Sequence, residues 1–264
     1  MLEKLRLRDR RANHTADRVS SAPPAPAGID FYGAAIVGAD TIGELAVTQP
    51  VLDRVLALLG TLEQDDYVDY VRAFVEAGRT AAGEHWCYAD ITTVLDAAAE
   101  LLRPTSYLEI GVRRGRSAAV VAAGAPECAV VAVDLWNEGY AGMENPGPDH
   151  VRSQLALVGH RGPLRFVSGD SHVELPRLFG AEPDLTFDLI TVDGDHSTRG
   201  ARRDLEDVLP RLRVGGALVF DDVSHRSHPD LARVWNKAVA GKRRYATWAF
   251  DDVGYGVAVA VRRW

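Results

Sequence analysis

Five short apolar runs after Pro104 constrain the fold more than any other feature of the sequence. They are SYLEIG, AVVAVDL, LRFVSGD, FDLITVDG and GALVFDD, and segments with helical periodicity lie between them. Each run has the length and composition of a strand that is buried on both faces. This alternation predicts βαβ units and an α/β fold with a doubly wound, mostly parallel sheet.

The segments between these runs predict helices over 117–123, 150–158, 172–179 and 200–212. The last two apolar stretches, YATWAF and VGYGVAVAV, have no helix between them. We therefore expect them to form an antiparallel hairpin at one edge of the sheet.

The first hundred residues have a different pattern. Residues 1–28 end in SSAPPAPAG, whose prolines favour a flexible arm over a helix or a central strand. Residues 29–103 contain segments with helical periodicity, the first beginning at Val51. The sequence thus predicts an arm (1–28), a helical cap or docking region (29–103) and a catalytic domain (104–264).

Composition narrows the function classes. The net charge of −7 and pI near 5.6 disfavour a nucleic-acid-binding protein, which normally has a basic surplus. No apolar stretch approaches the roughly 20 residues of a membrane span, and the N-terminus lacks a signal-peptide pattern. Cys87 and Cys128 lack the spacing of a zinc site or disulfide framework. These features predict a cytoplasmic protein with no membrane or nucleic-acid partner.

Acidic residues gather where the predicted strands end. In a parallel sheet the carboxyl ends of the strands meet at one edge, which is where ligands bind. A single aspartate at a strand end is as often a helix cap as a ligand contact, but several in succession favour a binding site. The acids at or near these ends are Glu109, Asp134, Asp170, Asp193, Asp221 and Asp222.

The segment YLEIGVRRGRS has the order strand, glycine turn, helix start. Gly111 and Gly115 would let the backbone pass close to a ligand, and Ser117 would support the start of the helix. The G-x-G-x-x-G pattern of dinucleotide enzymes is absent. Glu109, directly before the turn, suits an amino-acid moiety or hydroxyl groups better than a pyrophosphate.

The next two strand ends suit a nucleoside. Asp134 is placed to accept hydrogen bonds from ribose hydroxyls, with Leu135 beside it as a further cofactor contact. Asp170 is placed to meet an adenine amino group, with Ser171 adjacent. Together these acids favour a nucleoside-binding site.

YLEIGVRRGRS, Asp134, Asp170 and the terminal hairpin resemble the class I S-adenosylmethionine-dependent methyltransferases, over about residues 105–264. The resemblance implies a Rossmann-like sheet and S-adenosylmethionine as cofactor. It implies that Glu109, Gly111 and Gly115 surround the methionine portion, that Asp134 binds ribose, and that Asp170 and Ser171 lie by adenine.

A second group of acids follows the last two parallel strands. Asp193, Asp221 and Asp222 are expected to share one crevice with His196. Carboxylates in a dry crevice repel one another and keep their protons unless a cation lies among them. Lys and Arg are scarce in both segments, so a divalent cation is the expected counter-charge, and all-oxygen ligation suits magnesium, calcium or manganese rather than zinc. Asp195 either supports the turn or orients His196.

His196 is the candidate general base. An imidazole is mostly neutral at pH 7 and can accept a proton from a hydroxyl group. A metal bound to the same oxygen would lower its pKa and fix its position. The oxygen would then attack the methyl carbon of a sulfonium in line.

The stretch VDGDHSTRGARRDLEDVLPRLRVGGALVFDD resembles the metal-dependent O-methyltransferases of antibiotic biosynthesis. These include the macrocin- and mycinamicin-type macrolide-sugar enzymes and a cephalosporin-hydroxylase-like family. The resemblance implies metal on Asp193, Asp221 and Asp222, a catalytic pair of Asp193 and His196, and Asp193 close to the cofactor. The Asp-Asp pair departs from the Glu-Asp of some relatives, and relatives also suggest a homo-oligomer formed through the N-terminal helices.

The sequence therefore predicts an S-adenosylmethionine- and Mg²⁺-dependent O-methyltransferase for a hydroxyl group of a small natural product, such as the deoxysugar of a glycosylated antibiotic. A catechol-type enzyme acting on an aromatic diol is the alternative in the same chemistry. A nicotinamide dehydrogenase and a non-catalytic nucleoside-binding protein are alternatives of other classes. His225 and His228 either line the substrate pocket or lie on a surface loop, and Trp86 and Tyr88 either cover the cofactor or pack between helices.

Overall fold

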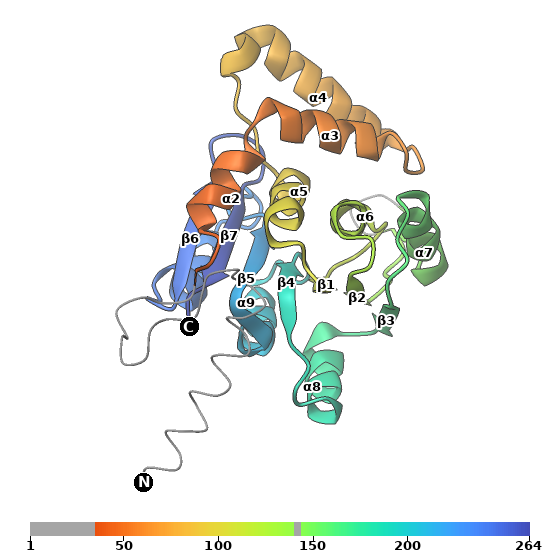
Figure 1. Cartoon of the computed structure of the whole chain (residues 1–264), viewed down its shortest axis with the longest axis vertical. Helices are drawn as coiled ribbons and strands as arrows, with labels where there is room; N and C mark the ends of the chain where they lie inside the picture. Colours follow the sequence, from red (N-terminus) through yellow and green to blue (C-terminus); the bar gives the residue numbers. More distant parts are fainter. Residues whose placement is uncertain (1–34, 140–143) are drawn as a thin grey trace.

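The computed structural model describes residues 35–139 and 144–264. A seven-stranded sheet with the order β3-β2-β1-β4-β5-β7-β6 forms its centre (Figure 1). The strands are β1 (Ser106–Ile110), β2 (Ala129–Asp134), β3 (Leu164–Ser168), β4 (Phe187–Val192), β5 (Leu212–Asp221), β6 (Tyr245–Phe250) and β7 (Val257–Arg262). β1 to β5 are parallel, and β7 runs antiparallel to both β5 and β6. The predicted parallel sheet and terminal hairpin are confirmed.

Helices cover both faces of this sheet. In the N-terminal region they are α2 (Ala39–Ala46), α3 (Gln49–Leu59), α4 (Asp66–Ala82) and α5 (Ile91–Leu102), with a short 3₁₀ turn at Gly83–His85. In the rest of the chain they are α6 (Arg116–Gly124), α7 (Pro148–Leu157), α8 (Ser171–Ala181), α9 (Thr198–Val208) and α10 (Leu231–Trp235), with short turns at Leu209–Arg211 and Asn236–Ala240.

The core has two apolar clusters, one on each face of the sheet. Successive strand residues point to opposite faces, so Leu189 of β4 joins one cluster and Ile190 the other. The first cluster contains buried residues of α2 to α7, and the second those of α8, α9 and α10. Figure 1 shows α3 and α4 outside α5, so α5 lies between the sheet and the outer helices.

The boundaries of α5 follow from its sequence. Asp90 accepts hydrogen bonds from the backbone of Thr92 and Thr93, and the Thr93 hydroxyl accepts from the Asp90 amide, which makes a capping box. The helix ends at Arg103, whose φ of 46° lies in the left-handed region, directly before Pro104. It buries apolar side chains around most of its surface because it has helices and the sheet as neighbours.

The N-terminal helices share one apolar cluster with the sheet. The division at residue 103 stays a prediction, and residues 1–28 lie outside the described part of the chain. Within the described residues, no helix is long and apolar enough to cross a membrane.

The structure differs from expectation at the end of one helix. The helix expected over 200–212 ends at Val208, and β5 already begins at Leu212. Pro210 has no amide hydrogen to continue the helix, so a tight 3₁₀ turn follows instead. The sequence also gave no sign of α10.

Candidate active site

A cavity of about 1020 Å³ opens at the carboxyl ends of the parallel strands. Residues that follow β1, β2, β3, β4 and β5 line it, together with Tyr67, Ile91 and Thr92 from the N-terminal helical region. The strand order reverses between β1 and β4, and such a switch point is where open α/β sheets bind ligands. The cavity therefore lies where the sequence predicted a site.

The turn after β1 passes very close to the turn after β4. Gly111 has a φ of +87°, and a Cβ on it would lie 1.9 Å from the carbonyl oxygen of Asp193. Any side chain at this position would collide with the neighbouring backbone. Glycine is thus required here for the crossing of the two loops at the floor of the cavity.

Ion pairs anchor the glycine turn after β1, and the sequence did not predict these pairs. The Arg114 guanidinium lies 2.9 Å from Glu63 and 3.0 Å from Asp65, and Arg116 also pairs with Asp65. Gly115, with a φ of 76°, is the residue that begins α6. The loop before α4 therefore holds the loop that the cofactor is expected to contact.

Glu109 lies beneath the cavity wall, not in it. Its side chain is 0% exposed, and its carboxyl group contacts the Tyr107 hydroxyl at 3.1 Å and accepts a hydrogen bond from Ser117. Burial raises the pKa of Glu109 to about 8, against the opposing effect of these hydrogen bonds. Ser117 does line the cavity, so Glu109 reaches the site through it.

Asp134 is the last residue of β2 and lines the cavity. Its carboxylate accepts hydrogen bonds from the backbone amides of Arg113, at 2.7 Å, and Trp136, at 2.6 Å. These bonds hold the carboxylate between the loop that follows β1 and the loop that follows β2. The neighbouring Leu135 is 56% exposed and also lines the cavity. The structure thus brings the predicted ribose ligand, Asp134, and the predicted cofactor contact, Leu135, into one cavity wall.

Asp170 and Ser171 line the same cavity after β3. Asp170 caps α8, because its side chain accepts from the backbone amide of His172 at 2.9 Å. The Ser171 hydroxyl donates to Asp204 at 2.6 Å. Asp170 thus caps a helix and also lines the cavity.

The acids of the last two parallel strands meet around an imidazole. His196 Nε2 lies 2.9 Å from Asp222 Oδ2 and 3.4 Å from Asp193 Oδ1. One ligand atom from each of Asp193, His196 and Asp222 falls within 4.8 Å of the others, close enough for one metal ion. Asp221 lines the cavity but is not in this set. The structure therefore groups His196 with two of the three predicted ligands.

Burial and mutual repulsion perturb these acids. The pKa of Asp193 is raised by burial and by the Asp222 charge, while His196 and Arg113 act in the opposite direction. Burial and the charges of Asp193 and Asp222 hold the pKa of Asp221 well above its ordinary value. A bound cation would remove this cost, since it favours the ionised form of every carboxylate around it.

A row of aromatic rings continues from His196 along one wall. The His196 and His228 rings stack with centroids 4.9 Å apart, His225 lies 4.8 Å from His228, and Tyr255 lies 4.0 Å from His225. His225, His228 and Tyr255 all line the cavity. His225 and His228 were expected either in the substrate pocket or on a surface loop, and the structure places them in the cavity wall.

Asp195 belongs to the turn. Its carboxylate accepts from the Ser197 amide at 2.7 Å, at the start of α9, and lies 3.6 Å from the His172 ring. A Cβ on Gly200 would lie 1.8 Å from Asp195 Oδ2, so glycine at this point in α9 makes room for the carboxylate. Asp195 thus supports the loop at the start of α9.

Trp86 and Tyr88 pack between elements. Their rings stack with centroids 5.5 Å apart at an interplanar angle of 3°, and Phe74 of α4 contacts both. The Tyr88 hydroxyl donates to Asp90 at 3.1 Å. Neither ring lines the cavity, so these residues pack between elements and do not cover the proposed cofactor site.

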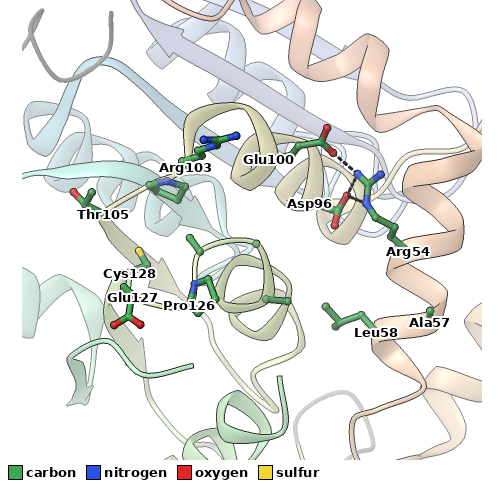
Figure 2. Close-up of a pocket in the computed structure, with 14 residues that line it drawn as sticks. Arg54, Ala57, Leu58, Asp96, Glu100, Arg103, Thr105, Pro126, Glu127 and Cys128 are labelled. Atoms are coloured by element: carbon green, nitrogen blue, oxygen red, sulfur yellow. Dashed lines mark hydrogen bonds and ion pairs between the residues drawn. The ribbon is translucent and has the colours of Figure 1, made fainter. Parts of the chain in front are cut away.

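A second cavity of about 800 Å³ lies at the opposite, amino end of the strands, beside the ends of α5 and α6 (Figure 2). Figure 2 shows Arg54 directed at Asp96 and Glu100, each at 2.5 Å. Glu127, on the opposite side, pairs with Arg161 at 2.7 Å. All three acids in this wall therefore have a guanidinium partner.

Comparison with known proteins agrees with the fold. Residues 108–223 match a family model described as a methyltransferase domain. A comparison with curated proteins finds no relative of this sequence. Residues 108–223 are thus similar to a methyltransferase domain, and the seven-stranded sheet has the class I methyltransferase fold.

Three solved structures share this fold. An O-methyltransferase from Bacillus cereus in complex with S-adenosylhomocysteine is 20% identical, with a TM-score of 0.53 over 76% of this chain and 92% of its own. TomG from Streptomyces achromogenes, involved in tomaymycin synthesis and in complex with S-adenosylmethionine, is 21% identical, with a TM-score of 0.53 over 77% and 92%. The TDP-rhamnose 3'-O-methyltransferase of calicheamicin biosynthesis is 20% identical, with a TM-score of 0.52 over 81% and 93%.

Proposed function

We propose that this protein is an S-adenosylmethionine-dependent O-methyltransferase that uses Mg²⁺ or another divalent cation and methylates a hydroxyl group of a small natural product. One observation carries the proposal: a single cavity contains two sets of residues. The residues suited to bind a nucleoside lie at the ends of β1 to β3, and the acid–imidazole cluster, which is Asp193, His196 and Asp222, lies after β4 and β5. A nucleoside-binding protein without catalytic activity would need only the first of these. The methyltransferase-domain match supports the same reading.

The half of the cavity after β1 to β3 would hold the cofactor. Gly111 leaves the floor of the loop free of side-chain atoms, and the Asp134 carboxylate faces a position suited to ribose hydroxyls. Ser117 would contact the methionine portion, with Glu109 behind it as its hydrogen-bond partner. When bound, the cofactor supplies a methyl group activated by a sulfonium.

Asp193, His196 and Asp222 fit a divalent cation, because their ligand atoms lie within one coordination sphere and two of them carry negative charge. Asp221, on the same wall, would complete the set of acids predicted from the sequence. A cation held there would lower the pKa of an acceptor hydroxyl. These residues would therefore bind and orient the acceptor oxygen.

His196 would take the proton of the acceptor hydroxyl. Its Nε2 atom lies between Asp193 and Asp222, so the imidazolium formed by proton uptake would be stabilised by two carboxylates. The same position would also suit a metal ligand. The variant His196→Ala separates these two roles. If His196 is the base, the variant loses turnover and keeps its affinity for metal and cofactor. If His196 is a metal ligand, the variant loses metal affinity as well.

The lining of the acceptor side favours a sugar or polyol over a catechol. His225, His228, Ser227 and Asp222 present polar groups there, and Tyr255 adds one ring. A catechol would suit a flat apolar slot better. Vicinal hydroxyls of a deoxysugar could bind one cation in a bidentate manner, and the calicheamicin neighbour is a TDP-rhamnose methyltransferase. We propose a deoxysugar of a glycosylated natural product as the acceptor.

The test is methyl transfer from labelled S-adenosylmethionine to a panel of glycosylated natural products and catechols, with and without chelator. We expect label on a glycoside, loss of transfer with chelator, and recovery with Mg²⁺. Transfer that is insensitive to chelator would contradict the metal role, and transfer only to catechols would contradict the sugar. The predicted homo-oligomer is checked by the mass in solution.

A further inference from the structure

Asp204 is a buried carboxylate that the proposed reaction does not use. It lies on α9, its side chain is 0% exposed, and it does not line the cavity. Burying a carboxylate is costly unless hydrogen bonds or opposite charges satisfy it. Its partners therefore indicate what the carboxylate holds in place.

The partners of Asp204 come from the first turn of α8 and from the loop after β4, at the end of the cavity proposed to hold adenine. Oδ1 accepts from the Ser171 hydroxyl at 2.6 Å and lies 3.3 Å from His172 Nδ1, both in the first turn of α8. Oδ2 lies 3.4 Å from the Asp195 amide, in the loop after β4. A Cβ on Gly194 would lie 3.1 Å from the same oxygen, so the absent side chain leaves this approach open.

The hydrogen bond to Asp204 determines how Ser171 can interact with a ligand. A hydroxyl has one proton to donate and two lone pairs that accept. The Ser171 hydroxyl donates its one proton to Asp204 at 2.6 Å, so the longer contact of 3.3 Å between Ser171 Oγ and His172 Nδ1 does not use that proton. On its cavity side, Ser171 Oγ can then only accept a hydrogen bond. The 6-amino group of adenine is a donor, whereas the 6-oxo group of hypoxanthine is an acceptor.

We infer that Asp204 is a positioning and specificity-determining residue: by fixing Ser171 as an acceptor, it makes the site select a 6-amino purine over a 6-oxo purine. The inference rests on the proposed cofactor site, since it places the base of the cofactor beside Ser171. Asp204 acts through Ser171 and does not touch the ligand.

Asp204→Asn is the informative variant because it keeps the shape of the side chain. The Asp195 amide still needs an acceptor, so the Asn oxygen remains on that side and the amino group faces Ser171. Ser171 then accepts from the asparagine, and its own proton can turn towards the ligand. The site would gain a donor that suits a 6-oxo group.

The experiment compares calorimetric affinities of S-adenosylhomocysteine and its deaminated analogue, S-inosylhomocysteine. We expect wild type to prefer the adenosyl compound by at least about tenfold, and Asp204→Asn to lower this ratio severalfold, the effect of one hydrogen bond, while the Asp170 carboxylate keeps its own preference for the amino group. Glu206→Gln is the matched control: it removes one negative charge from the same helix, at an exposed side chain that pairs with Arg202. Its ratio should equal that of wild type.

A general loss of structure would weaken both ligands equally, so the ratio separates positioning from stability. Ser171→Ala removes the acceptor itself and should also lower the ratio, which keeps the test decisive if Asp204→Asn does not fold. An unchanged ratio in a folded Asp204→Asn variant, or in Ser171→Ala, would overturn the inference. Failure of wild type to bind S-adenosylhomocysteine at all would instead contradict the proposed function.

Discussion

The two ends of the sheet handle acidic residues in opposite ways. At the carboxyl end, Asp193 and Asp221 are half-buried beside another carboxylate, and both have raised pKa values because of burial and repulsion. At the amino end, burial alone would raise the pKa of Asp188, but hydrogen bonds from Arg213 and Thr105 hold it below its ordinary value. One end concentrates unbalanced negative charge, and the other neutralises it within the fold.

This difference separates groups that serve a ligand from groups that serve stability. A carboxylate with a guanidinium partner already has its counter-charge and contributes to folding. Carboxylates pressed together in a cavity raise the free energy of the unliganded protein, and a cationic ligand would relieve this. Exchanging acids for amides at the two ends should therefore change different properties.

The largest expected effect is on activity at the carboxyl end. Asp193→Asn removes one charged ligand from the acid–imidazole cluster, and we expect methyl transfer to fall on the order of 100-fold or more. Asp96→Asn makes the same chemical change at the amino end, where Asp96 contacts Arg54, and should leave transfer within about twofold. Rates with labelled cofactor at saturating Mg²⁺ measure both. Equal losses of methyl transfer in the two variants would contradict the claim that the acids at the carboxyl end serve a ligand and those at the amino end serve stability.

The next effect is on stability at the amino end. Asp188 accepts from Arg213 at 2.7 Å and from the Thr105 amide and hydroxyl at 2.9 and 2.7 Å. Asp188→Asn should lower the free energy of unfolding at pH 7 by about 2 kcal/mol, since hydrogen bonds to a charged group are lost. Because the folded pKa is lowered, the wild-type advantage is present above the unfolded pKa and disappears as the pH falls through the folded value.

Urea unfolding at pH 7 measures this loss. Glu182→Gln is the control, because Glu182 forms an exposed ion pair with Arg165 and should change stability by less than about 0.5 kcal/mol. A loss in Asp188→Asn no larger than in the control would show that its guanidinium pair does not stabilise the fold.

The third effect is a gain in stability at the carboxyl end. The pKa of Glu109 is raised to about 8 by burial, so the folded protein keeps a proton that the unfolded chain releases above about pH 4.5. Wild type should therefore lose stability between these two pH values, and Glu109→Gln should not. We expect equal melting temperatures near pH 4 and a rise on the order of 10 °C for the variant at pH 8, since each pKa unit is about 1.4 kcal/mol.

Thermal unfolding across that pH range makes the comparison. The sign is opposite to that for Asp188, because the folded pKa is raised here and lowered there. A variant less stable than wild type at pH 8, or a difference independent of pH, would contradict the assignment of a buried, protonated Glu109.

Local signals were sufficient to predict the sheet. The apolar runs, the acids that end them and the absence of a helix between the last two stretches gave the parallel strands and the hairpin. Pro104 marked the end of α5 because proline restricts the residue before it. α10 was missed because its five residues are too few to show a helical period.

The site was predictable where strand ends determined it and not where distant loops meet. Asp134, Asp193 and Asp222 could be placed because each follows a strand at one edge of the sheet. The pairing of Arg114 with Glu63 depends on how the N-terminal helices pack, which no local pattern encodes. Asp204 was missed for a similar reason, since a charged residue within a helix is usually solvent-exposed.

The central claim is that the cavity at the carboxyl end of the sheet binds S-adenosylmethionine. Calorimetric titration of wild type with S-adenosylhomocysteine, and separately with NAD, tests it most directly. We expect one molecule of S-adenosylhomocysteine to bind per chain and NAD to give no binding heat. Binding of NAD without binding of S-adenosylhomocysteine would contradict the account.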